Sequence, residues 1–151
     1  VPLFKKLYNN KAESIPITDE RMTRFWVTIE QGVDFVLSSL EMMQGGEIYI
    51  PKIPSMSMVK LAEAIAPGIE KKLIGIRPGE KLHEVMVPQD DSRNTVGLED
   101  RFIIEPAFKW WLEDGNRIDE AKPVPENFSY ASDTNTDWLD SERITALIEE
   151  N

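Results

Sequence analysis

The chain has 151 residues, of which 41% are hydrophobic and 29% charged, and its formal net charge is −10. These values are typical of a globular domain with its own core, and the negative charge disfavours nucleic acids and anionic membranes as partners. No cysteine is present, which excludes disulfides and thiolate metal sites and fits a reducing compartment, so we expect a cytoplasmic protein. No apolar run approaches the roughly 20 residues of a membrane-spanning helix.

The N-terminal region predicts a short helix followed by two extended segments. Residues 2–8 form the helix, because Pro2 is tolerated in a first turn and the apolar residues share one face. Ile15-Pro16-Ile17 predicts an edge strand, since Pro16 has no N–H to donate to a second neighbour. Residues 22–27 are aromatic and extended. This region also lacks an initiator methionine, so we expect the chain to be part of a longer protein.

Thr28 begins the strongest predicted helix. Thr28 and Gln31 have the spacing of a capping box, and Gly45-Gly46 is expected to end the helix. The apolar residues between these signals have helical spacing and form one stripe, which consists of Val33, Val36, Leu37 and Leu40.

The following segment alternates between strand and helix patterns. Residues 47–50 predict a strand and residues 51–54 a stiff loop. Ser57 is a candidate N-cap for a second helix, which Pro67-Gly68 ends. Residues 72–76 predict another strand.

That strand leads into Arg77-Pro78-Gly79-Glu80-Lys81-Leu82-His83-Glu84, the motif around which the chain is organised. Proline disfavours helix at Arg77, and Pro-Gly predicts a tight reversal. Arg77 and Glu80 should therefore project from a rigid corner, where a planar guanidinium suits a phosphate or diphosphate. The alternative is a strand–turn–helix connector with solvated charges. His83 is interpreted as a polar neighbour of the turn.

After this motif the chain becomes more polar and its predicted elements shorter. They are a polar turn at 89–94, a strand at 101–105, a surface loop at 114–127, a polar turn at 130–135 and a terminal helix at 137–150.

The motifs of self-contained catalysis are absent from the sequence. It has no Gly-x-x-Gly-x-x-Gly or Gly-x-Gly-x-x-Gly motif, no Walker loop and no Tyr-x-x-x-Lys pair. A Ser-His-Asp triad would need His83, the only histidine, and no serine has the sequence of a nucleophile elbow. The chain therefore indicates binding rather than catalysis.

Arg24 is the second candidate for binding an anion. It precedes Phe25-Trp26 in an extended segment, where it is either a phosphate-binding arginine or a surface arginine beside an aromatic cluster. The four tryptophans are expected to pack in a core or an interface, and they are Trp26, Trp110, Trp111 and Trp138.

Several motifs occur in a characteristic order, namely Val-Pro-Leu-Phe-Lys-Lys at 1–6, Ile-Pro-Ile-Thr-Asp at 15–19, Met-Thr-Arg-Phe-Trp at 22–26, Gly-Glu-Ile-Tyr-Ile-Pro-Lys at 46–52 and Arg-Pro-Gly-Glu-Lys-Leu-His-Glu at 77–84. With these motifs the chain resembles the C-terminal half of the inverting UDP-N-acetylglucosamine 4,6-dehydratases. These enzymes belong to the extended short-chain dehydrogenase/reductase superfamily and act in the biosynthesis of pseudaminic acid and related polysaccharides. The resemblance covers residues 1–105 and resumes over 128–135 and the terminal helix.

The resemblance implies an α/β fold: the substrate-binding C-terminal subdomain of a Rossmann-type enzyme, with short strands, flanking helices and no N-terminal Rossmann half. Residues 106–127 would be a variable surface segment and residues 128–151 a terminal turn and helix. The absent half would bind NADP and carry the catalytic residues. We therefore expect this chain to hold no cofactor, to be inactive alone and to form a homo-oligomer only as part of the full-length enzyme.

The resemblance also implies a UDP-sugar site. Val1 to Lys5 would line the cleft, the strand Ser14 to Ile17 would lie along the uracil, Arg24 and Arg77 would reach the diphosphate, and Glu80 would bind the ribose. The implied substrate-binding residues are Val1, Pro2, Leu3, Phe4, Lys5, Ser14, Pro16, Ile17, Arg24, Arg77 and Glu80.

Two alternatives stay open. The chain could be the same portion of a UDP-sugar C4-epimerase, which only the absent half would distinguish. It could also be a non-catalytic acidic interaction domain without a nucleotide site.

Overall fold

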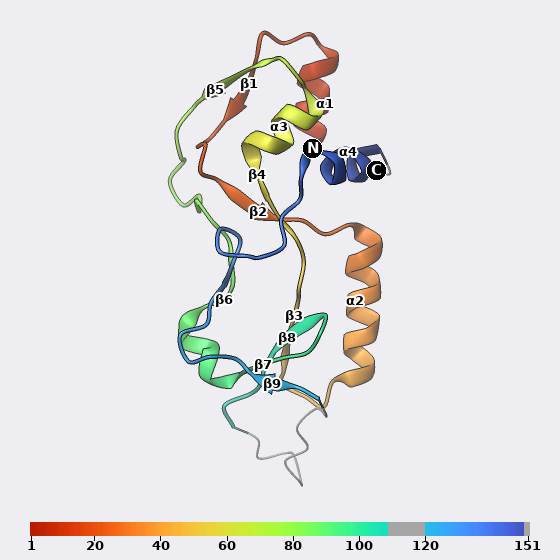
Figure 1. The fold of residues 1–151 in the computed structure, drawn as a ribbon, viewed down its shortest axis with the longest axis vertical. Coiled ribbons are helices and arrows are strands. Elements are labelled where there is room, and N and C mark those ends of the chain that lie inside the picture. The colour runs from red at the N-terminus through yellow and green to blue at the C-terminus, as the bar shows by residue number, and fades with distance from the viewer. Residues whose placement is uncertain (109–119, 150–151) are drawn as a thin grey trace. The chain divides into compact units, whose positions relative to one another are not determined.

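The computed structural model describes residues 1–108 and 120–149, as a mixed α/β fold of short helices and strands (Figure 1). The chain divides into two compact units, and each is built from segments that are distant in the sequence. Unit 1 contains Val1–Trp26, Pro54–Glu84 and Ser132–Asn151, and unit 2 contains Val27–Ile53 and Val85–Ala131. No helix in the described ranges is long and apolar enough to cross a membrane.

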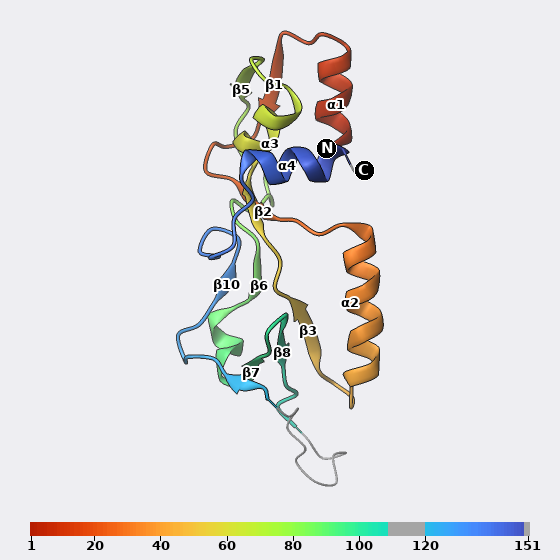
Figure 2. The same ribbon diagram turned by 45° about the vertical axis from the view of Figure 1, so that its right-hand side comes forward.

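Unit 1 consists of two small sheets and three helices. Its elements are α1 (Pro2–Asn9), β1 (Ser14–Ile17), β2 (Thr23–Phe25), β4 (Ser55–Ser57), α3 (Met58–Ile65), β5 (Glu70–Leu73) and α4 (Ser141–Glu149). β1 is parallel to β5, and β2 is antiparallel to β4. The helix α3 contacts α1, α4 and β1 (Figures 1 and 2).

The core of unit 1 follows from the alternation of β1. Because successive side chains of a strand point to opposite faces, Ile15 and Ile17 are buried while Ser14 and Pro16 are only half-buried. The two isoleucines join one hydrophobic cluster with side chains from all three helices, among them Phe4, Leu61, Ile65 and Ile144. The predicted edge strand is confirmed, because β1 pairs only with β5 among the described strands.

Unit 2 is built around a four-stranded antiparallel sheet of order β3-β8-β7-β9, with α2 beside it (Figure 2). Its elements are α2 (Ile29–Met42), β3 (Ile48–Pro51), β6 (Val85–Val87), the 3₁₀ helix Gln89–Asn94, β7 (Thr95–Gly97), β8 (Arg101–Ile104), β9 (Lys122–Pro123) and β10 (Tyr130–Ala131). β6 and β10 form a separate antiparallel pair.

The capping box of α2 is confirmed. The Gln31 backbone N–H donates to Thr28 Oγ1 at 3.2 Å, and the Thr28 backbone N–H donates to Gln31 Oε1 at 3.0 Å. The helix ends at Met42, before the predicted stop at Gly45-Gly46.

The apolar stripe of α2 is turned away from the sheet of unit 2. The four stripe residues Val33, Val36, Leu37 and Leu40 are 51–57% exposed. The opposite, polar side of the helix faces β8: buried Arg101 donates to Ser38 Oγ and Ser39 Oγ at 2.9 Å each, and its guanidinium lies 4.8 Å from the Phe35 ring centroid. An amphipathic stripe normally covers a core, whereas this one is more than half exposed.

The predicted strand at 72–76 is wrong in its bounds. β5 runs from Glu70 to Leu73, because its position is set by pairing with β1. The last bond to β1 runs from the Ile74 N–H to the Ile17 carbonyl at 2.9 Å, and Gly75 then turns the chain with a φ of +83°. Arg77 therefore lies beyond the ladder rather than at the end of the strand.

The terminal helix begins at Ser141, not at the predicted Asp137. Residues 137–139 are extended because they pair with Ser55, whose N–H donates to the Asp137 carbonyl at 2.9 Å and whose carbonyl accepts from Leu139 at 2.8 Å. Helical periodicity alone did not reveal this competing backbone pairing. The predicted end of the helix at Glu150 lies outside the described residues.

Several short strands were not predicted, namely β4, β6, β7, β9 and β10. β9 lies within the predicted surface loop at 114–127, of which residues 114–119 lie outside the described ranges. β10 lies in the predicted polar turn at 130–135, yet Tyr130 and Ala131 are buried. Trp26 packs against the core of unit 1 as expected, whereas Trp110 and Trp111 are outside the described residues.

Candidate functional site

Arg77 to Glu80 form the rigid corner that the sequence predicts. The Glu80 N–H donates to the Arg77 carbonyl at 3.0 Å, and the Arg77 N–H donates to Glu80 Oε2 at 3.2 Å. Gly79 has a φ of +82°, the value that the third residue of a type II turn requires, and Pro78 occupies the position that proline favours. The turn is therefore closed by one backbone and one side-chain hydrogen bond.

The corner presents a cation. The Arg77 side chain is exposed and has no hydrogen bond or ion pair with any residue that the structure describes. Glu80 is half-buried, and only its Oε2 is engaged in the turn. The corner thus combines a free guanidinium with a carboxylate that has one oxygen available, a set suited to an anionic ligand that also carries hydroxyls.

Arg24 has a different environment. Its Nη1 donates to the carbonyls of Thr23 at 2.6 Å and Leu82 at 3.1 Å, and its Nη2 donates to the Lys81 carbonyl at 2.9 Å. Its Nε lies 3.5 Å from Glu84 Oε1. Arg24 therefore anchors the segment that follows the corner, and one Nη2 hydrogen remains for a ligand.

The predicted residues of α1 divide between surface and core. Pro2 and Leu3 are exposed, whereas Phe4 is buried in the core cluster of unit 1, with Val1 packed against it. Lys5 Nζ donates to the Ile148 carbonyl of α4 at 2.9 Å. The Phe4 side chain and the Lys5 ammonium thus have structural roles in this chain.

The predicted residues of β1 lie on two faces of the strand. Ser14 and Pro16 face away from the core, while Ile17 is 1% exposed and packs within it. Only the backbone of Ile17 is therefore available to a ligand. All the predicted substrate-binding residues lie in unit 1, and Arg24 is joined directly to the segment that carries Arg77 and Glu80.

A set of polar residues behind the corner was not predicted from the sequence. Thr23 Oγ1 lies 2.8 Å from His83 Nδ1 and 2.7 Å from Ser132 Oγ, and Ser132 Oγ accepts from the Glu84 N–H at 2.9 Å. Thr23 and Ser132 are buried and separated by 109 residues. No local pattern marks such a pair, since it exists only after the chain has folded.

A carboxylate in the same unit has a shifted pKa. Side-chain and backbone hydrogen bonds from Arg21 lower the pKa of Asp19 to about 2. Both groups lie on the surface between β1 and β2. No group of three or more histidine and carboxylate side chains in the described ranges could hold a metal ion.

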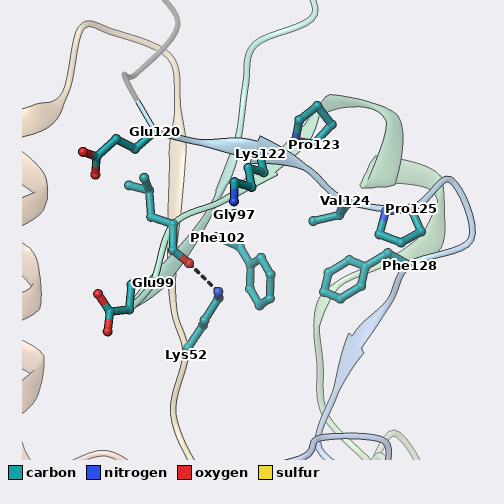
Figure 3. A pocket seen from close by; sticks show the side chains of 11 residues that line it. Lys52, Gly97, Glu99, Phe102, Glu120, Lys122, Pro123, Val124, Pro125 and Phe128 are labelled. Atoms are coloured by element: carbon teal, nitrogen blue, oxygen red, sulfur yellow. Dashed lines mark hydrogen bonds between the residues drawn. The ribbon is translucent and has the colours of Figure 1, made fainter.

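Unit 2 contains a separate open pocket of about 820 Å³ (Figure 3). The rings of Phe102 and Phe128 meet there at 4.9 Å between centroids, and Lys52 Nζ lies 4.6 Å from the Phe102 centroid while donating to the Leu98 carbonyl. None of the residues that the sequence singled out for substrate binding lines this pocket.

Three comparisons with known proteins bear on this geometry. The model of a family described as polysaccharide biosynthesis protein matches residues 1–106. A UDP-N-acetylglucosamine 4,6-dehydratase (inverting) from Campylobacter jejuni serotype O:2 is 48% identical over 98% of this chain, which spans 46% of that enzyme. The chain therefore spans about half the length of this curated relative.

Two further matches have lower sequence identity. A UDP-glucose 4-epimerase from Rickettsia massiliae is 32% identical over 69% of this chain and 31% of its own length. The X-ray structure of Pen from Bacillus thuringiensis aligns with a TM-score of 0.82 and 29% identity, covering 99% of this chain and 44% of that structure.

Proposed function

Because the family match covers more than half of its length, the chain belongs to the polysaccharide biosynthesis protein family, and we propose that it is the UDP-sugar-binding portion of an inverting UDP-N-acetylglucosamine 4,6-dehydratase. The observation that carries the proposal is the 48% identity to such an enzyme across 98% of the chain. The free guanidinium of Arg77 on its rigid corner supports it independently. The proposed reaction class is that of a lyase.

In this proposal the ligand is recognised mainly through its diphosphate and ribose. Arg77, with the remaining Nη2 hydrogen of Arg24, neutralises the diphosphate. The available oxygen of Glu80 accepts from a ribose hydroxyl, and the outward face of β1, with Ser14 and Pro16, lies along the uracil. These contacts are remote from the reacting sugar, so their role is to position it.

The proposed cofactor of the full-length enzyme is NADP, but the residues of this chain do not fit it. The sequence contains no glycine-rich strand–turn–helix motif that could hold a dinucleotide. We propose that NADP and the catalytic residues belong to the part of the enzyme outside this chain, which is the substrate-binding subdomain of a Rossmann-type short-chain dehydrogenase/reductase. The full-length enzyme is proposed to be a homo-oligomer.

The exposed stripe of α2 supports the presence of a further part. Monomeric proteins rarely leave a contiguous apolar patch of this kind uncovered, and four of its residues are more than half exposed. We propose that the rest of the full-length enzyme covers this face.

A titration with UDP tests the proposal. Arg77→Ala is expected to raise the Kd for UDP at least about tenfold, because hydrogen bonds to charged groups contribute roughly 1.5–3 kcal/mol. Arg93→Ala is the matched control, since Arg93 is an exposed arginine of unit 2 and should leave the Kd unchanged. Absent binding, or identical binding by all three proteins, would instead favour the acidic interaction domain.

Activity provides a second test. The 151-residue chain alone should not convert UDP-N-acetylglucosamine, whereas the full-length enzyme should release a 4-keto product. Turnover by the chain alone would refute its proposed role as a binding portion. A C4-epimerised product from the full-length enzyme would favour the second candidate, a UDP-sugar 4-epimerase, which the 32% identity over 69% of the chain keeps in consideration.

A further inference from the structure

The Arg77–Glu80 corner is attached to the rest of unit 1 by hydrogen bonds on each side of it, at Ile74 and at residues 81–84, which we call its N-terminal and C-terminal anchors. On its N-terminal side, the last bond to β1 is donated by the Ile74 N–H. From residue 75 to residue 80, the backbone N–H and carbonyl groups make no hydrogen bond outside the turn itself with any residue the structure describes. The position of the corner therefore depends on how firmly residues 81–84 are held.

Each residue from Lys81 to Glu84 is bound to β2 or to Ser132. The carbonyls of Lys81 and Leu82 accept from Arg24, and the Leu82 carbonyl also accepts from the Thr23 N–H at 3.2 Å. Ser132 closes the anchor at Glu84, since its N–H donates to the Glu84 carbonyl at 2.8 Å and its Oγ accepts from the Glu84 N–H. His83, which lies between Leu82 and Glu84, is held through its side chain, because its Nδ1 is 2.8 Å from Thr23 Oγ1.

The balance of donors and acceptors favours one direction for the hydrogen bonds behind the corner. Ser132 Oγ already accepts from the Glu84 N–H, and each hydroxyl has a single proton to donate. If Ser132 donates to Thr23 and Thr23 donates to His83 Nδ1, every hydroxyl proton has an acceptor. The imidazole proton then lies on Nε2, which is 3.9 Å from Asp133 Oδ2.

The opposite direction is unfavourable. If His83 Nδ1 carried the proton and donated to Thr23, only one of the two hydroxyls, Thr23 or Ser132, could donate to the other. The remaining hydroxyl proton, in a residue that is 6% or 0% exposed, would then have no acceptor among the described residues. A buried donor without a partner is costly, so the geometry favours an imidazole that accepts at Nδ1 and carries its proton on Nε2.

We propose that His83 is a positioning residue, whose Nδ1 accepts from Thr23 and thereby holds the C-terminal anchor of the Arg77–Glu80 corner. It does not touch the ligand in this proposal. Its effect on binding rests on the proposed UDP site, because a corner whose backbone is already ordered presents Arg77 to a phosphate without having to order that backbone on binding.

The protonation pattern can be measured without any ligand. His83 is the only histidine of the chain, so a ¹H–¹⁵N long-range correlation spectrum of the 151-residue protein contains one imidazole. At a pH where the ring is neutral, the Nε2–H tautomer is expected. A spectrum of the Nδ1–H tautomer would overturn the proposal.

Matched variants test the positioning role. His83→Asn keeps an acceptor near the position of Nδ1, while His83→Gln places its amide near Nε2. His83→Asn should bind UDP like the wild type, whereas His83→Gln should raise the Kd about tenfold, because the corner must then be ordered on binding. Thr23→Val, which removes the donor at similar volume, should match His83→Gln, and Thr23→Ser should match the wild type.

A ligand-free measurement separates this proposal from the UDP site itself. Backbone ¹⁵N relaxation of Gly79 and Glu80 should report increased motion in His83→Gln and Thr23→Val, but not in His83→Asn or Thr23→Ser. Unchanged relaxation in all four variants would overturn the positioning role. Increased motion together with no UDP binding by the wild type would support the positioning role and contradict the proposed function.

Discussion

Arg101→Ala is expected to lower the free energy of unfolding by about 3 kcal/mol, because Arg101 connects β8 to α2. Its side chain donates to Ser38 and Ser39 at 2.9 Å each and stacks on Phe35. The two charged hydrogen bonds contribute roughly 1.5–3 kcal/mol each before relaxation, and the cation–π contact of this buried arginine about 1–2 kcal/mol.

One feature reduces this sum to about 3 kcal/mol, and a further ion pair adds little to it. Both serine hydroxyls also donate to the Phe35 carbonyl, at 3.1 and 2.7 Å, so the substitution leaves their protons bound. The Asp100 carboxylate, paired with Arg101 at 2.6 Å, has a side chain that is 61% exposed, and pairs of this kind contribute roughly 0–1 kcal/mol. The buried groups that lose a hydrogen-bond partner in Arg101→Ala are therefore mainly the two serine oxygens.

Urea unfolding followed by circular dichroism measures the change. Arg93→Ala is the control, because Arg93 is exposed and surface substitutions usually change stability by less than about 0.5 kcal/mol. Arg101→Lys should be nearly as destabilising as Arg101→Ala, since an ammonium cannot reproduce the planar fork. A loss below about 1 kcal/mol for Arg101→Ala, with an unchanged m value, would refute the view that this arginine holds α2 on the sheet.

The pKa of about 2 for Asp19 predicts a ¹³C-detected titration midpoint near that value, and the midpoint should return toward 3.8 in Arg21→Ala. The stabilising contribution of this pair is present above pH 3.8 and is lost as the pH falls through 2. An unchanged midpoint in Arg21→Ala would contradict the assignment of the shift to Arg21. Gly79→Ala should destabilise the chain by about 1 kcal/mol, because Gly79 has a positive φ. Gly32→Ala, within α2, should instead stabilise the chain by about 0.5–1 kcal/mol in thermal unfolding. Equal effects of the two substitutions would argue against the turn at Arg77–Glu80. Val36→Asp should change the stability of this chain by less than about 0.5 kcal/mol, since Val36 is 57% exposed. The same substitution should strongly destabilise the full-length enzyme. If neither protein is destabilised, no other part of the enzyme covers the apolar stripe of α2.

Features that depend on a few consecutive residues could be predicted from the sequence. The capping box at Thr28 needs only the threonine and the glutamine three residues later, and the Arg77 corner needs only a Pro-Gly pair. The amphipathic pattern of α2 likewise predicted a helix. It did not predict which face is buried, because the sheet of unit 2 receives the polar side through Arg101.

Features that depend on distant partners could not be predicted. The bounds of β5 are set by β1, and the late start of α4 is set by pairing with Ser55. Strands of two or three residues such as β10 are too short to show an alternating pattern. Tyr130 was therefore interpreted as part of a turn, although it is buried and its hydroxyl donates to the Ile53 carbonyl.

The two candidate arginines are equivalent in the sequence but not in the fold. The donors of Arg24 bind the carbonyls of Lys81 and Leu82, so this guanidinium is part of the frame that holds the corner. The guanidinium of Arg77 has no partner among the described residues, and Arg77 makes none of the hydrogen bonds that hold residues 81–84. Loss of UDP binding in Arg24→Ala would therefore combine a lost charge with a displaced corner. The same loss in Arg77→Ala can be assigned to the charge itself, which makes Arg77 the more direct probe of diphosphate recognition.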